Sequence, residues 1–310
     1  MPVPMPMPTP TPLSETEWTS RRAAHAARVE NLIGDYLTDR GHGGVHPVLD
    51  FLFTYYSHRP GQLRRWNPGH GVVLTGDRAR DYAEFASYEQ VDTADGPGFR
   101  VRSDLVERRR SSIEFTLGLL VGTRDRPPML GCFGLHEWAM VYRGGSSAQR
   151  HEQVPLRLGH QGTDAVVESM TLRCTHYDAF RFFTPDAAPR NALALSPDSR
   201  LGSEQPGCIH ASMDLYKWSY KLGPLVDSEF LTDCFELALR ARTIDMRASP
   251  YDLSEFDLEP IRIETSAGRA EYVRAQGELS AEAAPLRSAL IARCQNLLIG
   301  GEFGVAPTAE

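Results

Sequence analysis

The chain has 310 residues, of which 41% are hydrophobic and 24% charged, and its formal net charge is −7. This length can bury a substantial core, and no apolar run approaches the roughly 20 residues of a membrane span. The negative charge argues against non-specific coating of nucleic acid, which rests on neutralising phosphates. Five widely spaced cysteines, without a Cys-x-x-Cys pair, are typical of reduced thiols. We therefore expect a cytoplasmic protein with no membrane partner.

The N-terminal part combines a proline-rich stretch with a capped helix. MPVPMPMPTPTP alternates proline with other residues, so we expect residues 1–13 to form a disordered tail. Ser14, with Glu17 three residues later, predicts the start of a helix that runs to about Leu37. A short helix should follow GHGGVHP and end before Pro60, because proline restricts the residue that precedes it.

The central part mixes strand, helix and irregular patterns. Short strands are predicted at 71–74 and 99–102. The segments 103–123 and 128–143 have apolar patterns that predict helices. Residues 144–206 are rich in Gly, Pro, Ser and Asp, and within them LRCTHYDAFRFF fits a strand or a helix.

The C-terminal third has the clearest helical signal. A Gly-Pro turn separates two helical patterns, which predicts a helical hairpin near 207–247. A long helix should follow near 269–299, and residues 301–310 should form a disordered tail. Because no repeat and no linker divides the chain, we expect a predominantly α-helical single domain with minor short strands over residues 14–300.

The first helix of this hairpin contains the only two lysines, Lys217 and Lys221, among 33 basic side chains. At about 100° per residue, they share one narrow stripe with His210 and Asp214, between two apolar walls. Such a helix should be buried, with its stripe lining a pocket or meeting charged partners. Unlike arginine, a desolvated lysine can lose its proton near neutral pH and act as a base or nucleophile.

The second helix repeats this spacing with four charged residues. A short turn makes consecutive helices antiparallel neighbours, so the two stripes should meet. The expected neighbours are Lys221 with Glu229, Lys217 with Asp233, and His210 and Asp214 with Glu236 and Arg240. This arrangement is either a buried ion-pair ladder or the floor of an active site with perturbed pKa values.

Histidine and carboxylate pairs recur along the chain, as His46 with Asp50, His136 with Glu137, His176 with Asp178 and His210 with Asp214. A His and an Asp four apart on a helix share one face and can both ligate a metal. Iron or zinc is therefore a possible cofactor, with candidate ligands His210, Asp214, Glu236, His176 and His46. Against this, no HExxH motif exists, and adjacent residues such as His136 and Glu137 point in different directions on a helix.

A basic and aromatic segment, TYYSHRPGQLRRW, contains Arg59, Arg64 and Arg65. Arginines can bind phosphates while rings stack bases, which makes it a possible nucleic-acid contact. The alternative is a helix end with its rings in the core and its arginines in water. No GxGxxG, Walker A or G-x-S-x-G motif is present, which disfavours dinucleotide, P-loop and α/β-hydrolase functions.

Five phrases together resemble an actinobacterial family labelled 3-methyladenine DNA glycosylase: HPVLDFLFTYYSHRPGQLRRWNPGHGVVL, GLHEWAMVYR, HYDAFRFFTP, HASMDLYKWSYKLGPLV and DMRASPYDLSEFDLEPIRIET. The resemblance covers most of residues 15–298. It implies base-excision repair of damaged duplex DNA, in which a flipped alkylated purine is cleaved from its sugar. The chain has neither a helix-hairpin-helix segment nor the Cys and His zinc pattern of other enzymes with this activity.

Under this base-excision hypothesis no cofactor is needed. Asp214 or Glu236 would activate water or stabilise the cationic sugar, and Lys217 could form a Schiff base, with His210 in the same catalytic floor. The expected substrate-binding residues are Trp218, Tyr216, Tyr220, Lys221, Arg240, Arg59, Arg64 and Arg65.

Two alternatives stay open. The chain could be a metal-dependent enzyme that acts on a small molecule, with His210, Asp214 and Glu236 completed by His46 or His176 around iron or zinc. It could also be a non-catalytic helical binding protein whose charged stripe is only an ion-pair ladder, with a dry and fully paired interface.

Overall fold

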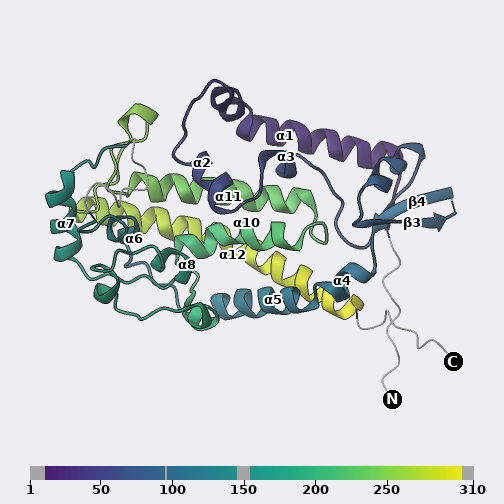
Figure 1. Ribbon diagram of the computed structural model, residues 1–310. Coiled ribbons are helices and arrows are strands. Elements are labelled where there is room, and N and C mark those ends of the chain that lie inside the picture. The colour runs from purple at the N-terminus through teal and green to yellow at the C-terminus, as the bar shows by residue number, and fades with distance from the viewer. Residues whose placement is uncertain (1–10, 95, 145–153, 302–310) are drawn as a thin grey trace, which may run out of the picture.

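The computed structural model describes residues 11–94, 96–144 and 154–301. It confirms a predominantly helical fold with minor strands. Figure 1 shows the long helices lying side by side along the molecule, with the strands at one end and the short helices α6, α7 and α8 at the other. The long helices are α1 (Glu15–Gly41), α5 (Arg110–Arg124), α10 (Ile209–Leu222), α11 (Ser228–Arg247) and α12 (Ser266–Gly301).

Helix α1 begins at the predicted capping box. The backbone N–H of Glu17 donates to the Ser14 hydroxyl, and the Glu17 carboxylate accepts the N–H of Ser14 at 2.9 Å. These bonds satisfy two of the free donors at a helix start. The helix runs past the expected end to Gly41 and buries one face, on which Trp18 stacks on Trp66.

A small sheet covers the N-terminal end of α1. Its strands are β1 (Thr11–Leu13), β2 (Val72–Leu74), β3 (Tyr88–Thr93) and β4 (Gly96–Val101), in the order β1-β2-β4-β3. Strand β1 is parallel to β2 and the other pairs are antiparallel. The two strands predicted from the sequence are confirmed as β2 and β4.

Residues 11–13 correct the expectation of a disordered tail over 1–13. They form β1, since the Thr11 N–H donates to the Gly71 carbonyl at 2.9 Å and the Thr75 N–H donates to the Leu13 carbonyl at 3.0 Å. Backbone pairing to β2 thus overrides the poor strand signal of Pro12. The rest of that expected tail, and residues 302–310 of the C-terminal one, lie outside the described residues.

Short elements connect the long ones: α2 (Leu49–Tyr55), α3 (Pro60–Leu63), η1 (Asp77–Glu84), α4 (Asp104–Arg108), α6 (Leu135–Ala139), α7 (Gly159–Ser169), α8 (Tyr177–Phe180), η3 (Ala188–Arg190), η4 (Pro197–Ser199), α9 (Arg200–Ser203) and η5 (Ser254–Phe256). The helix predicted over 128–143 is reduced to α6. Phe133, Gly134 and Arg143 all have positive φ values, which are incompatible with a continuous α-helix.

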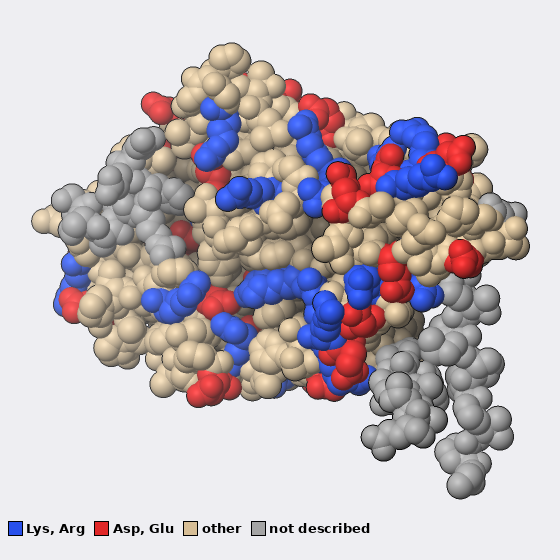
Figure 2. All heavy atoms as spheres, turned by 45° about the vertical axis from the view of Figure 1, so that its right-hand side comes forward, with Lys and Arg blue, Asp and Glu red and all other residues tan. Residues whose placement is uncertain are grey.

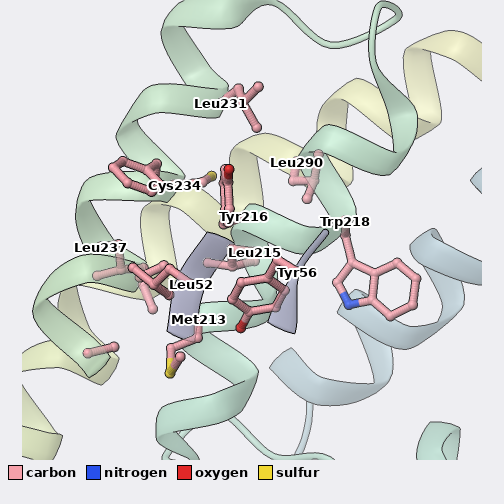
Figure 3. Packing of buried hydrophobic residues seen from close by; sticks show 14 of the residues in the cluster. Leu52, Tyr56, Met213, Leu215, Tyr216, Trp218, Leu231, Cys234, Leu237 and Leu290 are labelled. Atoms are coloured by element: carbon pink, nitrogen blue, oxygen red, sulfur yellow. The ribbon is translucent and has the colours of Figure 1, made fainter. Parts of the chain in front are cut away.

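The predicted hairpin is confirmed as α10 and α11, and α10 is buried almost all round. Figure 3 shows Met213, Leu215 and Tyr216 of α10 among side chains of the neighbouring helices, with Trp218 directed away from Leu237. The Trp218 ring packs on Phe115 of α5 at 5.6 Å between centroids. Because α10 is surrounded, its ionisable side chains must find partners inside the protein.

Charges of both signs share the surface. Figure 2 shows Lys and Arg side chains in a band across the middle of one face, with Asp and Glu among them. Within the described residues, no helix combines the length and the apolar character needed to cross a bilayer.

His58, in the loop between α2 and α3, supplies a testable pH dependence. Its Nδ1 lies 2.8 Å from the Tyr216 hydroxyl, and burial lowers the pKa of His58 to about 4. The unfolded chain takes up the proton first, near pH 6.5, so the free energy of unfolding should fall as the pH drops from about 6.5 to 4. At pH 5 this loss is about 2 kcal/mol relative to pH 7.

Urea unfolding at pH 7 and pH 5 measures this effect. We expect His58→Gln, which does not titrate, to show a pH-dependent loss smaller by about 2 kcal/mol than that of the wild type. His42→Gln, at an exposed position, is the control and should behave like the wild type. Equal losses in wild type and His58→Gln would contradict the assignment.

Candidate functional site

Helix α10 places three ionisable residues inside the protein. His210, Asp214 and Lys217 are 4%, 1% and 8% exposed. Lys221, one turn further along, is exposed. The predicted stripe therefore divides into a buried part, which needs internal partners, and one solvated lysine.

Lys217 lies between two carboxylates. Its Nζ is 2.8 Å from Asp214 Oδ2 and 2.6 Å from Oδ2 of Asp178 on α8. Asp214 also accepts a hydrogen bond from the Tyr56 hydroxyl at 3.1 Å, and Asp178 accepts one from Arg200 at 2.7 Å. The ammonium group of Lys217 is thus shared between two buried carboxylates, of which Asp178 is also paired with Arg200.

These contacts fix the protonation of Lys217. Burial opposes its charged form, but the attraction of Asp214 and Asp178 outweighs burial and raises the pKa of Lys217 above its ordinary value. Burial likewise opposes ionisation of Asp214, yet the charge of Lys217 holds the pKa of Asp214 well below its usual range. Lys217 is therefore an ammonium ion at neutral pH, which disfavours its expected role as a nucleophile.

His176 joins this cluster from the segment before α8. Its Nε2 is 3.3 Å from Asp214 Oδ2 and 3.6 Å from Glu204 Oε1. Burial opposes protonation of His176, but these carboxylates raise its pKa above the ordinary value. Neither ring nitrogen has a well-oriented hydrogen-bond partner among the described residues.

A second buried cluster connects α6 to α11. His136 Nε2 lies 2.7 Å from Asp245 Oδ1. Arg242 donates to Asp245 at 2.7 Å and to Glu137 at 2.5 Å. All four residues are 5% exposed or less. His136 and Glu137 were expected to point in different directions and not to enter one site easily. They contact different members of this cluster, His136 contacting Asp245 and Glu137 contacting Arg242, so both belong to it.

His210 lies between the two clusters. Its ring centroid is 4.4 Å from that of His136 and 5.2 Å from that of His176. Its imidazole has no hydrogen-bond partner within residues 11–94, 96–144 and 154–301. Burial lowers the pKa of His210 well below its ordinary value. It is therefore a neutral imidazole with a lone pair available to a ligand.

Three residues of these clusters can hold a metal ion. His136, His210 and Asp245 each offer one ligand atom, and all three atoms lie within 4.8 Å of one another. His136 Nε2 and Asp245 Oδ1 are buried without a well-oriented hydrogen bond among the described residues. Tetrahedral zinc with bonds of about 2.1 Å separates its ligand atoms by about 3.4 Å. The 2.7 Å contact between His136 and Asp245 would therefore have to open by about 0.7 Å to admit the ion.

A cavity of about 440 Å³ reaches this centre. His210 and Glu137 form part of its wall and connect it to the ligand set. The remaining lining residues are Asp50, Phe51, Thr54, Tyr55, Met140, Asp178, Ala179 and Phe182. Its size suits a small molecule, for which about 300 to 1,000 Å³ is usual. Among the described residues, its lining offers aromatic surface and carboxylates, without Lys or Arg.

A second, much smaller cavity of about 10 Å³ also borders His136 and His210. Three cysteines, Cys132, Cys174 and Cys208, line it. That volume is about enough for one water molecule or ion. Burial raises the pKa of all three thiols, so they are protonated at neutral pH.

The predicted pairing across the hairpin is wrong. Glu236 and Asp233 both pair with Arg28 of α1 at 2.7 Å, and Glu229 pairs with Arg21. Arg240 pairs with Glu282 of α12. The charged side chains of α11 therefore pair with residues of α1 and α12, and not with the stripe of α10. Glu236 and Arg240 lie outside the cluster around Lys217.

The histidine expected to complete a metal shell has a local role. Nδ1 of His46 accepts the backbone N–H groups of Val48 and Leu49 at 3.3 Å, at the start of α2. His46 is thus separate from the ligand set, which retains only His210 of the five predicted ligands.

The predicted substrate-binding residues are dispersed. Tyr216 and Tyr220 pack against His58, and Lys221 lies 5.2 Å from the Trp218 ring. The arginines surround α3, where Arg64 pairs with Glu30. The 440 Å³ cavity contains none of the predicted residues Trp218, Tyr216, Tyr220, Lys221, Arg240, Arg59, Arg64 and Arg65 in its lining.

Sequence reasoning missed His136, Asp245 and Arg242 as partners of His210. One signal was available on α11, because Arg242 and Asp245 fall on the same side of the helix as Phe235 and Ala238. Ionisable residues three apart on an apolar face must be paired inside the protein. Glu204 and Arg200 carry no comparable signal, since they lie in the irregular region before α10.

No family model matches this chain, and neither a curated protein nor a solved structure shows significant similarity to it.

Proposed function

We propose that this protein is a metal-dependent enzyme that acts on a small molecule bound in the 440 Å³ cavity, with His136, His210 and Asp245 as ligands. The observation that carries the proposal is the convergence of their three ligand atoms within 4.8 Å beside that cavity. Two imidazoles and one carboxylate are a ligand set of zinc hydrolases and of iron(II) oxygenases. Both ions keep coordination positions open for water or substrate.

The surrounding residues suit this chemistry. Glu137 is positioned by Arg242 and borders the cavity, so its carboxylate can accept a proton from a reacting water or substrate. Phe51, Tyr55 and Phe182 provide apolar contact surface for the substrate. All five cysteines are free, which supports a place in the reducing cytoplasm. A fully paired, non-catalytic ion-pair ladder would not account for this cavity or for His210, whose imidazole has no hydrogen-bond partner among the described residues.

Metal analysis tests the ligand set. We expect about one iron or zinc ion per chain in the purified wild type. His210→Gln should lose most of this metal, because the two remaining ligands, His136 and Asp245, bind an ion only weakly. His25→Gln is the matched control and should keep its metal. His25 is also buried, but it lies away from the ligand set, where its ring is hydrogen-bonded to the Leu63 carbonyl. Wild type without metal after incubation with either ion, or equal metal in His210→Gln, would refute this centre.

Base excision on alkylated DNA, implied by the family resemblance, is the second candidate. The lining of the 440 Å³ cavity favours this function. An N3-alkylated adenine in DNA is a flat, positively charged base, which aromatic rings can stack on and carboxylates can attract. A single-turnover assay on duplex DNA that contains 3-methyladenine separates the two candidates. Release of the base by metal-depleted protein, and its loss in Asp214→Asn, would select the glycosylase. Absence of release, together with bound metal, would select the small-molecule enzyme.

A further inference from the structure

A third cavity, of about 280 Å³, has a wall of aromatic rings and shares no residue with the two described above. It lies where α3, η1 and β3 meet the end of α10. The rings that line it are those of His58, Trp66, Tyr82, Phe85, Tyr88 and Tyr220. Tyr82 is 4.8 Å from Tyr88 and 5.9 Å from Phe85 between centroids. Rings that pack on one another in this way form a continuous aromatic wall, against which a flat group can lie by stacking or edge contact.

A fourth cavity, of about 480 Å³, adjoins the third and shares Arg65, Trp66, Tyr82 and Phe85 with it. Its wall carries four arginines, Arg22, Arg64, Arg65 and Arg80, and two carboxylates, Asp81 and Glu84. The charges that line this cavity therefore sum to a net positive value, in a chain whose net charge is −7. An aromatic cavity and a basic one thus lie side by side and share these four side chains.

Two of these arginines are already neutralised, and two are not. Arg22 lies 3.4 Å from Asp81, and Arg64 pairs with Glu30. Arg65 and Arg80 are exposed and have no carboxylate within 4.0 Å in the part of the chain that the structure describes. The guanidinium of Arg65 lies 4.8 Å from the centroid of Phe85, at the junction of the two cavities.

We infer that the third and fourth cavities together bind a nucleoside phosphate, with its base among the rings and its phosphate on Arg65 and Arg80. A guanidinium matches phosphate oxygens in a bidentate way, and aromatic rings stack on any base. A phosphate ion alone would leave the aromatic cavity unused, and a neutral aromatic molecule would leave the two guanidinium groups unpaired. This site is separate from the proposed metal centre and does not depend on it.

Titration calorimetry with adenosine 5′-monophosphate, adenosine and inorganic phosphate tests the inference. We expect the nucleotide to bind at least tenfold more tightly than either part alone. The double variant Arg65→Gln/Arg80→Gln should weaken nucleotide binding about tenfold or more, because it removes the charge-assisted hydrogen bonds. The single variant Arg80→Gln should leave adenosine binding unchanged, because Arg80 lines the fourth cavity but not the aromatic one. Arg108→Gln is the matched control, since Arg108 is an exposed arginine on α4.

Three results would overturn the inference. The first is the absence of saturable nucleotide binding to folded wild-type protein at millimolar concentration. The second is equal affinity for the nucleotide and for phosphate, which would show an anion site only. The third is binding of a single-stranded oligonucleotide without binding of the free nucleotide. Melting temperatures of the variants close to that of the wild type would exclude misfolding, because both arginines are exposed.

Discussion

Replacement of Lys217 by methionine should lower the free energy of unfolding by about 3 to 5 kcal/mol, the cost of breaking a buried ion pair by removal of one partner. Lys217 Nζ lies within 2.8 Å of both Asp214 and Asp178, and those carboxylates are 1% and 7% exposed. Without the ammonium group, Asp214 keeps only the Tyr56 hydroxyl and the nearby His176. Urea unfolding at pH 7 measures the loss.

The second lysine gives a matched control. Lys221 is exposed and lies over the face of Trp218, so Lys221→Met should change stability by no more than about 0.5 kcal/mol. Adding Asp214→Asn to Lys217→Met should recover part of the loss, because it removes one uncompensated charge. If Lys217→Met lowered the free energy of unfolding by less than about 1 kcal/mol, the two carboxylates would have to be protonated or hydrated. The charge of Lys217 would then not be needed to compensate them.

Replacement of Arg242 by methionine should cost a similar amount, about 3 to 5 kcal/mol. Its guanidinium is 1% exposed and donates to both Glu137 and Asp245, so its removal leaves two buried carboxylates with less compensation. The measurement is urea unfolding in the presence of a chelator, which keeps any metal from replacing the lost charge.

Arg240→Met is the control on the same helix. Arg240 pairs with Glu282 at the surface, where both side chains are about half exposed, and such pairs are worth about 0 to 1 kcal/mol. Both variants replace an arginine of α11 by methionine, and the two positions are only two residues apart. Equal losses would mean that the buried network around Arg242 contributes no more than a surface ion pair, in contradiction of the structure.

The main helices were predictable from the sequence because their signals are local. The capping box at Ser14 marks the start of α1, and the Gly-Pro turn separates α10 from α11. Strand β1 could not be predicted, because its Thr11–Leu13 backbone is ordered by pairing with the distant β2. The pattern over 128–143 predicted a full helix, whereas the positive φ values at Phe133 and Gly134 leave only α6.

The candidate site was predictable in part. The stripe of His210, Asp214 and Lys217 on α10 is buried as expected, because apolar walls flank it. Its partners were assigned to the wrong element: periodicity shows which residues share a face, but not which neighbour covers that face. Asp178 and His136 come from α8 and α6, short helices without a strong periodic signal. Their approach to α10 is set by tertiary packing over long stretches of chain.

X-ray absorption at the metal edge is the most direct test of the central claim, the metal centre at His136, His210 and Asp245. For zinc-loaded wild-type protein we predict only nitrogen and oxygen neighbours at about 2.0 to 2.2 Å, with imidazole scattering from two histidines. Sulfur neighbours at about 2.3 Å would instead place the ion among Cys132, Cys174 and Cys208. That spectrum, or one without imidazole scattering, would contradict the ligand set.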